Sequence, residues 1–326
     1  MKGSEIWVKV LREVIKHTVG FPPNRAVDYS HVQYFNEEAN EVMHRLIDDS
    51  LKKHQGFAAC KFGTIELANI VSRLQEGQWK YKNYLDFIKG YPVPIYRYRE
   101  IERLGNNAGF FPADVFHVNQ FVELMLKDIP KVDLLASYAF CERYIENLIA
   151  PCVKVNLDSY YAPFLFDNPW TRILRNQRVL VIHPFAQSIK MQYKKRQSLF
   201  ENQDVLPEFK SLRVIQAVQS IAGNDCGFEN WFVALEHMKK QMEQEDFDIA
   251  LIGCGAYGFP LTIYAKQLGK VGIHLAGWLQ MLFGIYGKRW LEDQPQYAKY
   301  INGNWIRPSS NELPQRAKEI EGGCYW

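Results

Sequence analysis

The sequence predicts an α/β protein, in which a Rossmann-like parallel sheet with flanking helices follows a mostly helical N-terminal portion. Two observations support this. From Arg178 onward, short apolar runs alternate regularly with segments of helical spacing. One turn in this region reads G-x-G-x-x-G, at Gly253, Gly255 and Gly258. Strands that alternate with helices of this length imply parallel pairing and right-handed crossovers.

The C-terminal half, residues 169–326, is expected to form the Rossmann-like, nucleotide-binding lobe and a tail. Its apolar runs and amphipathic segments predict strand 179–182, helix 186–200, strand 212–218, helix 229–244, strand 249–252, helix 261–268 and strand 271–275. The aromatic and glycine content of the closing residues predicts a tail that folds back onto the body.

Residues 1–168 are expected to form an N-terminal lobe. The patterns predict helices at 6–15, 37–53, 67–74, 113–127 and 141–149, and strands at 57–61 and 134–139. The segment 78–103, rich in tyrosine and lysine, is predicted to be irregular surface. The aromatics and prolines of 157–170 either pack between lobes or stack on a sugar or base.

Polar and glycine residues follow the four predicted strands of the C-terminal half. Ligands of open α/β sheets bind along that edge, so these residues are candidate ligand contacts: His183, Ser188, Gln219, Gly253, Gly255, Tyr257 and His274. Glycine amides there can approach a phosphate. The alternatives are local: a strand cap for His183, buried backbone for Gln219, and a tight turn for the glycines.

Glu66 lies where a predicted strand ends and a helix begins. Gly63 and Thr64 precede it in the same turn and join the candidate contacts. A carboxylate at the mouth of a sheet can act as a base or a metal ligand. The alternative is that Glu66 only stabilises the helix dipole.

The composition excludes several classes of protein. A net charge of +3 and a pI near 8.4 do not indicate a nucleic-acid partner, though small acidic ligands fit. Six cysteines without a C-x-x-C pair argue against a zinc site or disulfide framework and suggest a cytoplasmic protein. We expect no signal peptide and no transmembrane segment. Peripheral attachment at the inner membrane face and homo-oligomers stay open.

Several motifs together resemble a bacterial glycosyltransferase group, the GT-D fold proteins, related to a family first catalogued as a domain of unknown function. The motifs are K-F-G-T-I-E-L at 61–67, N-A-G-F-F-P at 107–112, V-I-H-P-F-A-Q-S-I at 181–189, I-G-C-G-A-Y-G-F-P-L at 252–261, G-K-R-W at 287–290 and the closing E-G-G-C-Y-W.

The resemblance implies transfer of a sugar from a nucleotide-sugar donor, UDP-linked in our expectation, to a glycan or glycoprotein acceptor in surface polysaccharide synthesis. The family's D-x-E motif is associated with a divalent metal, Mn or Mg, and with catalysis. Its Glu corresponds to Glu66, but Thr64 stands at the Asp position. This loss weakens a site that needs oxygen ligands, so the chain works with a metal held by Glu66 and the diphosphate, works without metal, or is catalytically weak.

The working hypothesis is that the glycine turn and the helix after His183 hold the diphosphate, with Tyr257 and Arg307 as further phosphate contacts. Glu66 deprotonates the acceptor or positions a metal. One alternative is a non-catalytic nucleotide-sugar-binding subunit of a polysaccharide assembly. Another is a NAD- or methyl-donor-dependent enzyme, although the strand 271–275 is followed by no carboxylate for a dinucleotide ribose.

Overall fold

The computed structural model describes residues 3–21, 24–317 and 323–326. Its centre is a seven-stranded, all-parallel sheet in the order β3-β2-β1-β7-β6-β4-β5. The strands are β1 (Phe57–Lys61), β2 (Leu134–Ser137), β3 (Val153–Asn156), β4 (Arg178–His183), β5 (Ser211–Gln216), β6 (Ile249–Ile252) and β7 (Val271–His274). The predicted α/β class and Rossmann-like parallel sheet are confirmed.

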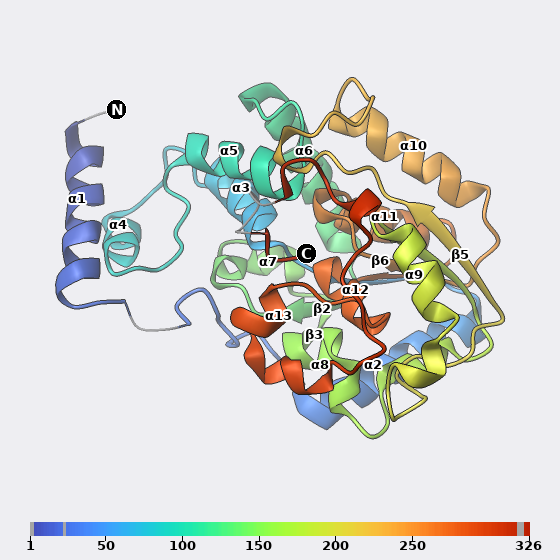
Figure 1. Cartoon of the computed structure of the whole chain (residues 1–326). Helices are drawn as coiled ribbons and strands as arrows, with labels where there is room; N and C mark the ends of the chain where they lie inside the picture. Colours follow the sequence, from blue (N-terminus) through green and yellow to red (C-terminus); the bar gives the residue numbers. More distant parts are fainter. Residues whose placement is uncertain (1–2, 22–23, 318–322) are drawn as a thin grey trace.

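Helices cover both faces of the sheet (Figure 1). The helices of the described residues are α1 (Gly3–Thr18), α2 (Asn36–Lys53), α3 (Thr64–Leu74), α4 (Tyr81–Ile88), α5 (Arg97–Ala108), α6 (Val115–Asp128), α7 (Glu146–Ile149), α8 (Leu157–Tyr161), α9 (Ala186–Tyr193), α10 (Trp231–Glu243), α11 (Gly258–Gln267), α12 (Leu279–Leu282) and α13 (Arg289–Glu292). Short 3-10 turns connect several of them.

All strands except the edge strand β5 bury side chains on both faces, which explains why most of them read as nearly continuous apolar runs. In β1, Ala58 and Cys60 join one core with α3, α5, α6, α10 and α11, while Phe57 and Ala59 join the other with α2, α8, α9 and α12. Successive side chains of a strand point to opposite faces. The sheet is therefore the middle of three layers.

Strands from both parts of the chain belong to this one sheet. β1, from residues 1–168, pairs with β7, from residues 169–326, with Phe57 opposite Val271 and Ala59 opposite Ile273. The chain leaves β4 toward the edge strand β5, whereas it leaves β6 toward β7. Connections that depart in opposite directions open a crevice at the carboxyl ends of the two strands. That crevice lies between the ends of β4 and β6.

Several predicted elements need correction. The segment 78–103, predicted to be irregular, contains α4 and the start of α5. Strand β3 was not predicted. The helix predicted at 186–200 ends at Tyr193, and much of the helix predicted at 141–149 is a 3-10 turn at Phe140–Tyr144.

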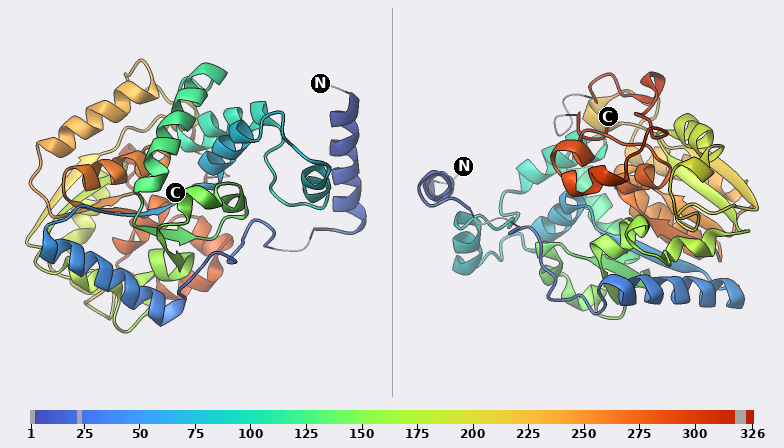
Figure 2. Two further views of the ribbon diagram at one scale, coloured as in Figure 1. Left: turned by 180° about the vertical axis from the view of Figure 1, so that it is seen from behind. Right: turned by 60° about the horizontal axis from the view of Figure 1, so that its bottom comes forward.

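Helix α1 stands at the extremity of the molecule and packs on α4 (Figures 1 and 2). Among the described residues, no helix has the length and apolar character needed to cross a membrane.

Candidate functional site

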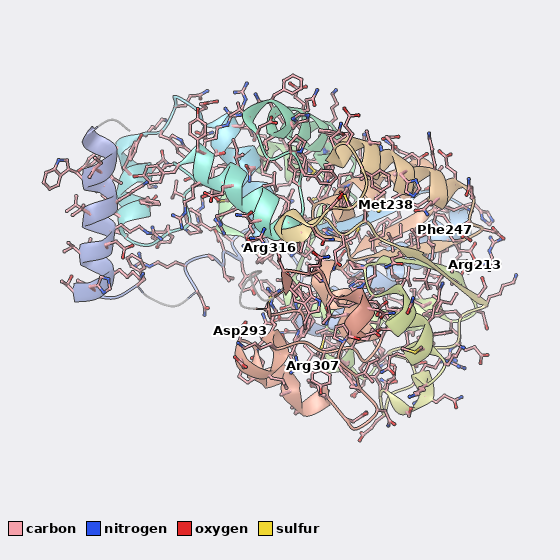
Figure 3. All side chains as sticks on the ribbon, turned by 45° about the horizontal axis from the view of Figure 1, so that its top comes forward. Arg213, Met238, Phe247, Asp293, Arg307 and Arg316 are labelled. Atoms are coloured by element: carbon pink, nitrogen blue, oxygen red, sulfur yellow. The ribbon has the colours of Figure 1, made fainter. Side chains whose placement is uncertain are left out.

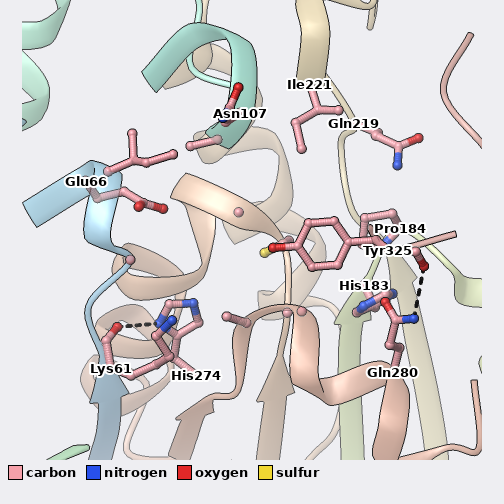
Figure 4. Close-up of a pocket in the computed structure, with 18 of the residues that line it drawn as sticks. Lys61, Glu66, Asn107, His183, Pro184, Gln219, Ile221, His274, Gln280 and Tyr325 are labelled. Atoms are coloured by element: carbon pink, nitrogen blue, oxygen red, sulfur yellow. Dashed lines mark hydrogen bonds between the residues drawn. The ribbon is translucent and has the colours of Figure 1, made fainter. Parts of the chain in front are cut away.

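One pocket lies at the carboxyl edge of the sheet and has a volume of about 250 Å³ (Figure 4). Segments that follow six of the seven strands contribute to its wall, together with the tail. The lining residues are Lys61, Gly63, Thr64, Ile65, Glu66, Asn107, Ala108, Tyr138, His183, Pro184, Phe185, Gln219, Ile221, Gly253, Cys254, Gly255, His274, Ala276, Gly277, Gln280, Arg289, Tyr325 and Trp326. The pocket thus brings together most of the candidate residues, including Glu66 and Gly255.

Glu66 has the one acidic side chain among the described residues that line this pocket. It sits in the first turn of α3, which begins at Thr64 directly after β1, and its side chain points into the pocket (Figure 4). A Cβ added to Gly63 would lie 1.9 Å from Glu66 Oε2, so the carboxylate folds back over this glycine. A carboxylate in the first turn of a helix also stabilises the helix dipole. The position of Glu66 is therefore compatible both with a role as base or metal ligand and with a role in stabilising α3.

The glycine turn between β6 and α11 is crowded at each of its three glycines. Gly255 has φ +57°, and a Cβ there would lie 2.8 Å from the Ala108 carbonyl oxygen. A Cβ on Gly253 would lie 2.4 Å from the carbonyl oxygen of Ala276. Gly253 and Gly255 both line the pocket. Their backbone therefore faces the space where a phosphate could approach.

Gly258, the third glycine of the motif, has a packing role. A Cβ at this position would lie 2.3 Å from Nε2 of His274. The missing side chain lets α11 approach the end of β7 closely, which is the role of the last glycine in such fingerprints.

Both pocket histidines are buried and neutral. His183 Nδ1 accepts the backbone N–H of Phe185 at 3.0 Å, so its proton is on Nε2. His274 Nδ1 lies 3.1 Å from the Lys61 carbonyl oxygen and donates to it. Burial lowers the pKa of each ring to about 3. The local hydrogen bond expected for His183 is present, and its ring also lines the pocket.

Because both histidines are buried and neutral, we expect the stability of the fold to decrease as the pH falls. Their folded-state pKa lies below the unfolded value, so the stabilisation is complete above about pH 6.5 and is lost as the pH falls from there toward 3. Each contributes up to about 1.4 kcal/mol per pH unit to this slope. Urea unfolding between pH 7 and 5 should therefore show a shallower slope for His183→Gln than for the wild type. The exposed His17→Gln is the control, and equal slopes for all three proteins would contradict the assignment.

Two cations line the pocket, Lys61 at the end of β1 and Arg289 at the start of α13. Arg289 Nη1 donates to the Tyr325 hydroxyl at 3.1 Å, and its guanidinium lies 4.3 Å from the centre of the Tyr325 ring. Among the described side chains that line the pocket, these two cations outnumber the one acidic side chain, Glu66. Such a pocket favours an anionic ligand.

The tail folds back and forms part of the wall, as the sequence predicted. The backbone N–H groups of Lys288 and Arg289 donate to Trp326 and Cys324 oxygens at 3.1 and 2.8 Å. Gln280 Nε2 donates to the Tyr325 carbonyl oxygen at 3.2 Å, and Tyr325 extends across the pocket from the side opposite Glu66 (Figure 4).

Two glycines form the seat for the tail. A Cβ on Gly277 would lie 2.3 Å from Tyr325 Cε1, and one on Gly287 would lie 2.4 Å from the Tyr325 carbonyl carbon. Sequence reasoning did not select Lys61, Arg289 or Tyr325. The motifs K-F-G, G-K-R-W and C-Y-W that contain them were the available signal.

Three candidate residues lie outside the residues that line the pocket. Ser188 is fully buried, and its hydroxyl donates to Glu312 Oε2. Tyr257 packs in the core, where its ring stacks on Trp231 at 5.0 Å. Arg307 lies on the surface, where Nη1 donates to the backbone oxygen of Trp326 at 2.5 Å (Figure 3).

The N-terminus of α9, expected to hold a phosphate, already faces a carboxylate of the same chain. The backbone N–H of Gln187 donates to Glu312 Oε1 at 2.7 Å, and that of Ser188 lies 3.3 Å from the same oxygen. Because Glu312 satisfies these donors, a diphosphate in the pocket has to rely on the glycine turn and the cations instead. The expectation for this helix end is corrected accordingly.

The metal-ligating side chains of the pocket are too few to hold a divalent cation with protein atoms alone. Among the described residues, no group of three or more His, Cys, Asp or Glu side chains is placed to hold a metal. Glu66 contributes one carboxylate, Thr64 replaces a second, and hard cations take six or more oxygens. A metal at this site would need oxygens from a bound diphosphate.

Fold and pocket together define an α/β protein of Rossmann-like architecture with a pocket at the carboxyl edge of its sheet, lined in part by Lys61 and Arg289. Searches against family models, curated proteins and solved structures found no significant match to the chain.

Proposed function

We propose that this protein is a glycosyltransferase that moves a sugar from a nucleotide-sugar donor to an acceptor hydroxyl. The observation that supports it most is one pocket in which the carboxylate of Glu66 lies with a glycine turn, the cations Lys61 and Arg289, and the aromatic ring of Tyr325. This arrangement suits a ligand with a diphosphate at its centre. The motif resemblance supports the same class of reaction.

In the proposed reaction, the donor diphosphate lies against the amides of the Gly253 to Gly255 turn, with Lys61 and Arg289 providing positive charge. The acceptor oxygen forms a bond to the anomeric carbon while the bond from that carbon to the diphosphate oxygen breaks. The electron pair leaves with the nucleoside diphosphate, and the acceptor proton passes to the Glu66 carboxylate. The amides and cations stabilise the charge that develops on the leaving group.

A non-catalytic nucleotide-sugar-binding subunit is the second candidate. Thr64 favours it, because this side chain stands where the resembling family has a second carboxylate. Hydrolysis of the donor in the absence of acceptor would distinguish an enzyme from a binding subunit.

The proposal is tested by a thermal-shift panel of nucleotide sugars, uridine diphosphate, NAD and S-adenosylmethionine, each with and without manganese. We expect stabilisation by uridine diphosphate or its sugars and none by NAD or S-adenosylmethionine. Stabilisation by NAD or S-adenosylmethionine alone would overturn the proposal. Donor consumption is then measured with the nucleotide sugar that gives the largest shift.

Removing the Tyr325 ring, which forms part of the pocket wall, is expected to lower the affinity for the ligand. Tyr325→Ala is expected to weaken binding of uridine diphosphate by about tenfold, because a contact surface is lost and Arg289 loses its hydroxyl acceptor. Tyr325→Phe keeps the ring and removes only the hydroxyl, so it should fall between Tyr325→Ala and the wild type. Isothermal titration measures all three proteins, and unchanged affinity for Tyr325→Ala would exclude the ring from the site.

A further inference from the structure

A second pocket, of about 220 Å³, adjoins the first. Thr64 lines both pockets, while the next turn of α3 contributes Leu67 and Ala68 to the second one only. Its other walls come from α1, α4, α5 and the segment after β2. A molecule bound there would have its inner end beside Thr64, in the same helical turn as Glu66.

The second pocket is rich in arginine. Arg12, Arg99 and Arg103 line it, and Glu100 is the one acidic residue among its described lining residues. Arg103 Nη1 pairs with Glu100 Oε2 at 2.8 Å. Within the described chain, neither Arg12 nor Arg99 forms an ion pair with a carboxylate. The lining therefore carries a formal excess of positive charge.

Arg12 is held in place by aromatic rings and backbone. Its guanidinium lies 4.3 Å from the centre of the Phe87 ring and 5.0 Å from that of Phe21. It also donates to the Phe87 carbonyl oxygen. Burial and the neighbouring Arg99 both lower the pKa of Arg12. A planar, partly desolvated guanidinium next to a second one is suited to phosphate oxygens.

The helix that carries Arg12 presents an apolar face to solvent. Helix α1 contacts the body through Val8, through Lys9, whose ammonium lies 4.3 Å from the Tyr96 ring centre, and through Arg12. The apolar residues of its opposite side are exposed: Ile6, Trp7, Val10, Leu11 and Val14, with Trp7 69% exposed. Figures 1 and 2 show α1 at the edge of the molecule.

An exposed apolar helix face that includes tryptophan, on a helix with basic residues, is typical of helices that lie in the membrane interface. The arginine pocket next to it adds the charge complementarity for an anionic headgroup. The exposed apolar face of α1 and the arginine pocket together suit a ligand with a lipid at one end and a phosphate group at the other.

We propose that the second pocket binds the acceptor, a sugar attached through phosphate or diphosphate to a membrane lipid, while α1 lies on the membrane surface. Arg12 and Arg99 contact the phosphate, and the acceptor sugar reaches past Thr64 toward Glu66. This inference rests on the proposed glycosyltransferase function for the identity of the reacting sugar, but the lipid and phosphate contacts can be tested without turnover.

The test is vesicle flotation of the full chain with saturating uridine diphosphate present, which occupies the first pocket. The vesicles are phosphatidylcholine alone or phosphatidylcholine with farnesyl diphosphate. We expect about tenfold more bound protein with farnesyl diphosphate, and Arg99→Glu should remove this increase. Trp7→Ser with Leu11→Ser should abolish binding to both kinds of vesicle while binding of uridine diphosphate stays unchanged.

Matched controls are available elsewhere on the surface. Arg213→Glu alters an arginine of β5, far from α1 in Figure 3, and Phe116→Ser alters an exposed aromatic residue of α6. Both should behave as the wild type. Soluble inorganic pyrophosphate should compete only weakly with the farnesyl diphosphate vesicles for the protein. Competition as strong as that by farnesyl diphosphate itself would mean that free phosphate is the ligand and would overturn the lipid assignment.

Other outcomes are equally decisive. Flotation of Arg99→Glu at the wild-type level would overturn the arginine pocket as a phosphate site. No flotation of the wild type, with a dimer that Trp7→Ser and Leu11→Ser dissociate, would show that a second copy covers α1 and overturn the membrane assignment. Flotation as expected without any binding of uridine diphosphate would uphold this pocket and count against the donor proposal alone.

Discussion

Glu66→Gln is expected to lower the rate of sugar transfer by about 10² to 10⁴-fold, the usual contribution of a general base. Glutamine keeps the shape of the side chain but cannot accept the acceptor proton. Among the described residues that line the pocket, Glu66 is the one with an acidic side chain, so none of the other described lining side chains is a second carboxylate base. Release of the nucleoside diphosphate in the presence of acceptor measures the effect, and circular dichroism and the melting temperature check the fold.

Two further variants sharpen this prediction. Glu123→Gln removes an exposed carboxylate from α6 and should leave transfer unchanged. Gly63→Ala keeps the Glu66 carboxylate but displaces it, because the new Cβ would lie 1.9 Å from Oε2, so it should lower transfer without removing the base. Wild-type turnover by Glu66→Gln would exclude Glu66 from the mechanism.

Gly255→Ala is expected to weaken binding of uridine diphosphate by about tenfold to a hundredfold. Gly255 has φ +57°, and the added Cβ would lie 2.8 Å from the Ala108 carbonyl oxygen. A conflict of this kind with backbone costs about 1–3 kcal/mol, and each 1.4 kcal/mol lost from binding is about a factor of ten. The turn has to shift, and its amides would then no longer be placed to bind the proposed diphosphate. Isothermal titration gives the affinity.

Gly303→Ala is the control for this substitution, because the space around Gly303 is open. It should bind uridine diphosphate with wild-type affinity. If Gly255→Ala also binds normally while its melting temperature falls, the turn serves packing only and does not hold the phosphate.

The alternation of strands and helices could be predicted because most of the parallel strands are buried on both faces. Such burial produces short, continuous apolar runs such as Ile249–Ile252. Strand β3 breaks this rule and was missed, because Lys154 and Asn156 interrupt its apolar pattern. Both are nevertheless buried, and Lys154 Nζ donates to the Cys152 carbonyl oxygen at 3.1 Å. A local pattern cannot show that a lysine finds a backbone acceptor.

The sheet edge could be predicted in part for a similar reason. The residues that follow parallel strands meet at one edge, so His183, Gln219, Gly253 and His274 were selected together, and all four line the pocket. Ser188 was also selected, yet its hydroxyl bonds Glu312, which lies 124 residues away in the sequence. Contacts over that separation depend on the path of the tail, which carries no periodic signal.

Which face of a helix is buried also depends on the elements that pack around it. The apolar spacing of Ile6, Val10 and Val14 predicted an amphipathic first helix, and α1 is helical there. These three side chains are nevertheless exposed. Arg12 and Lys9 make the contacts to the body through aromatic rings, which a hydrophobicity pattern does not register.

The pairing of β1 with β7 has a consequence for the chain when it is divided. Backbone hydrogen bonds join Phe57–Lys61 to Val271–His274, so a fragment 1–168 and a fragment 169–326 would each expose an unpaired strand. Open edges of apolar strands aggregate. We therefore expect each fragment to be insoluble by itself and the two, when co-expressed, to reassemble noncovalently, which makes this seam a natural place for a split-protein reporter.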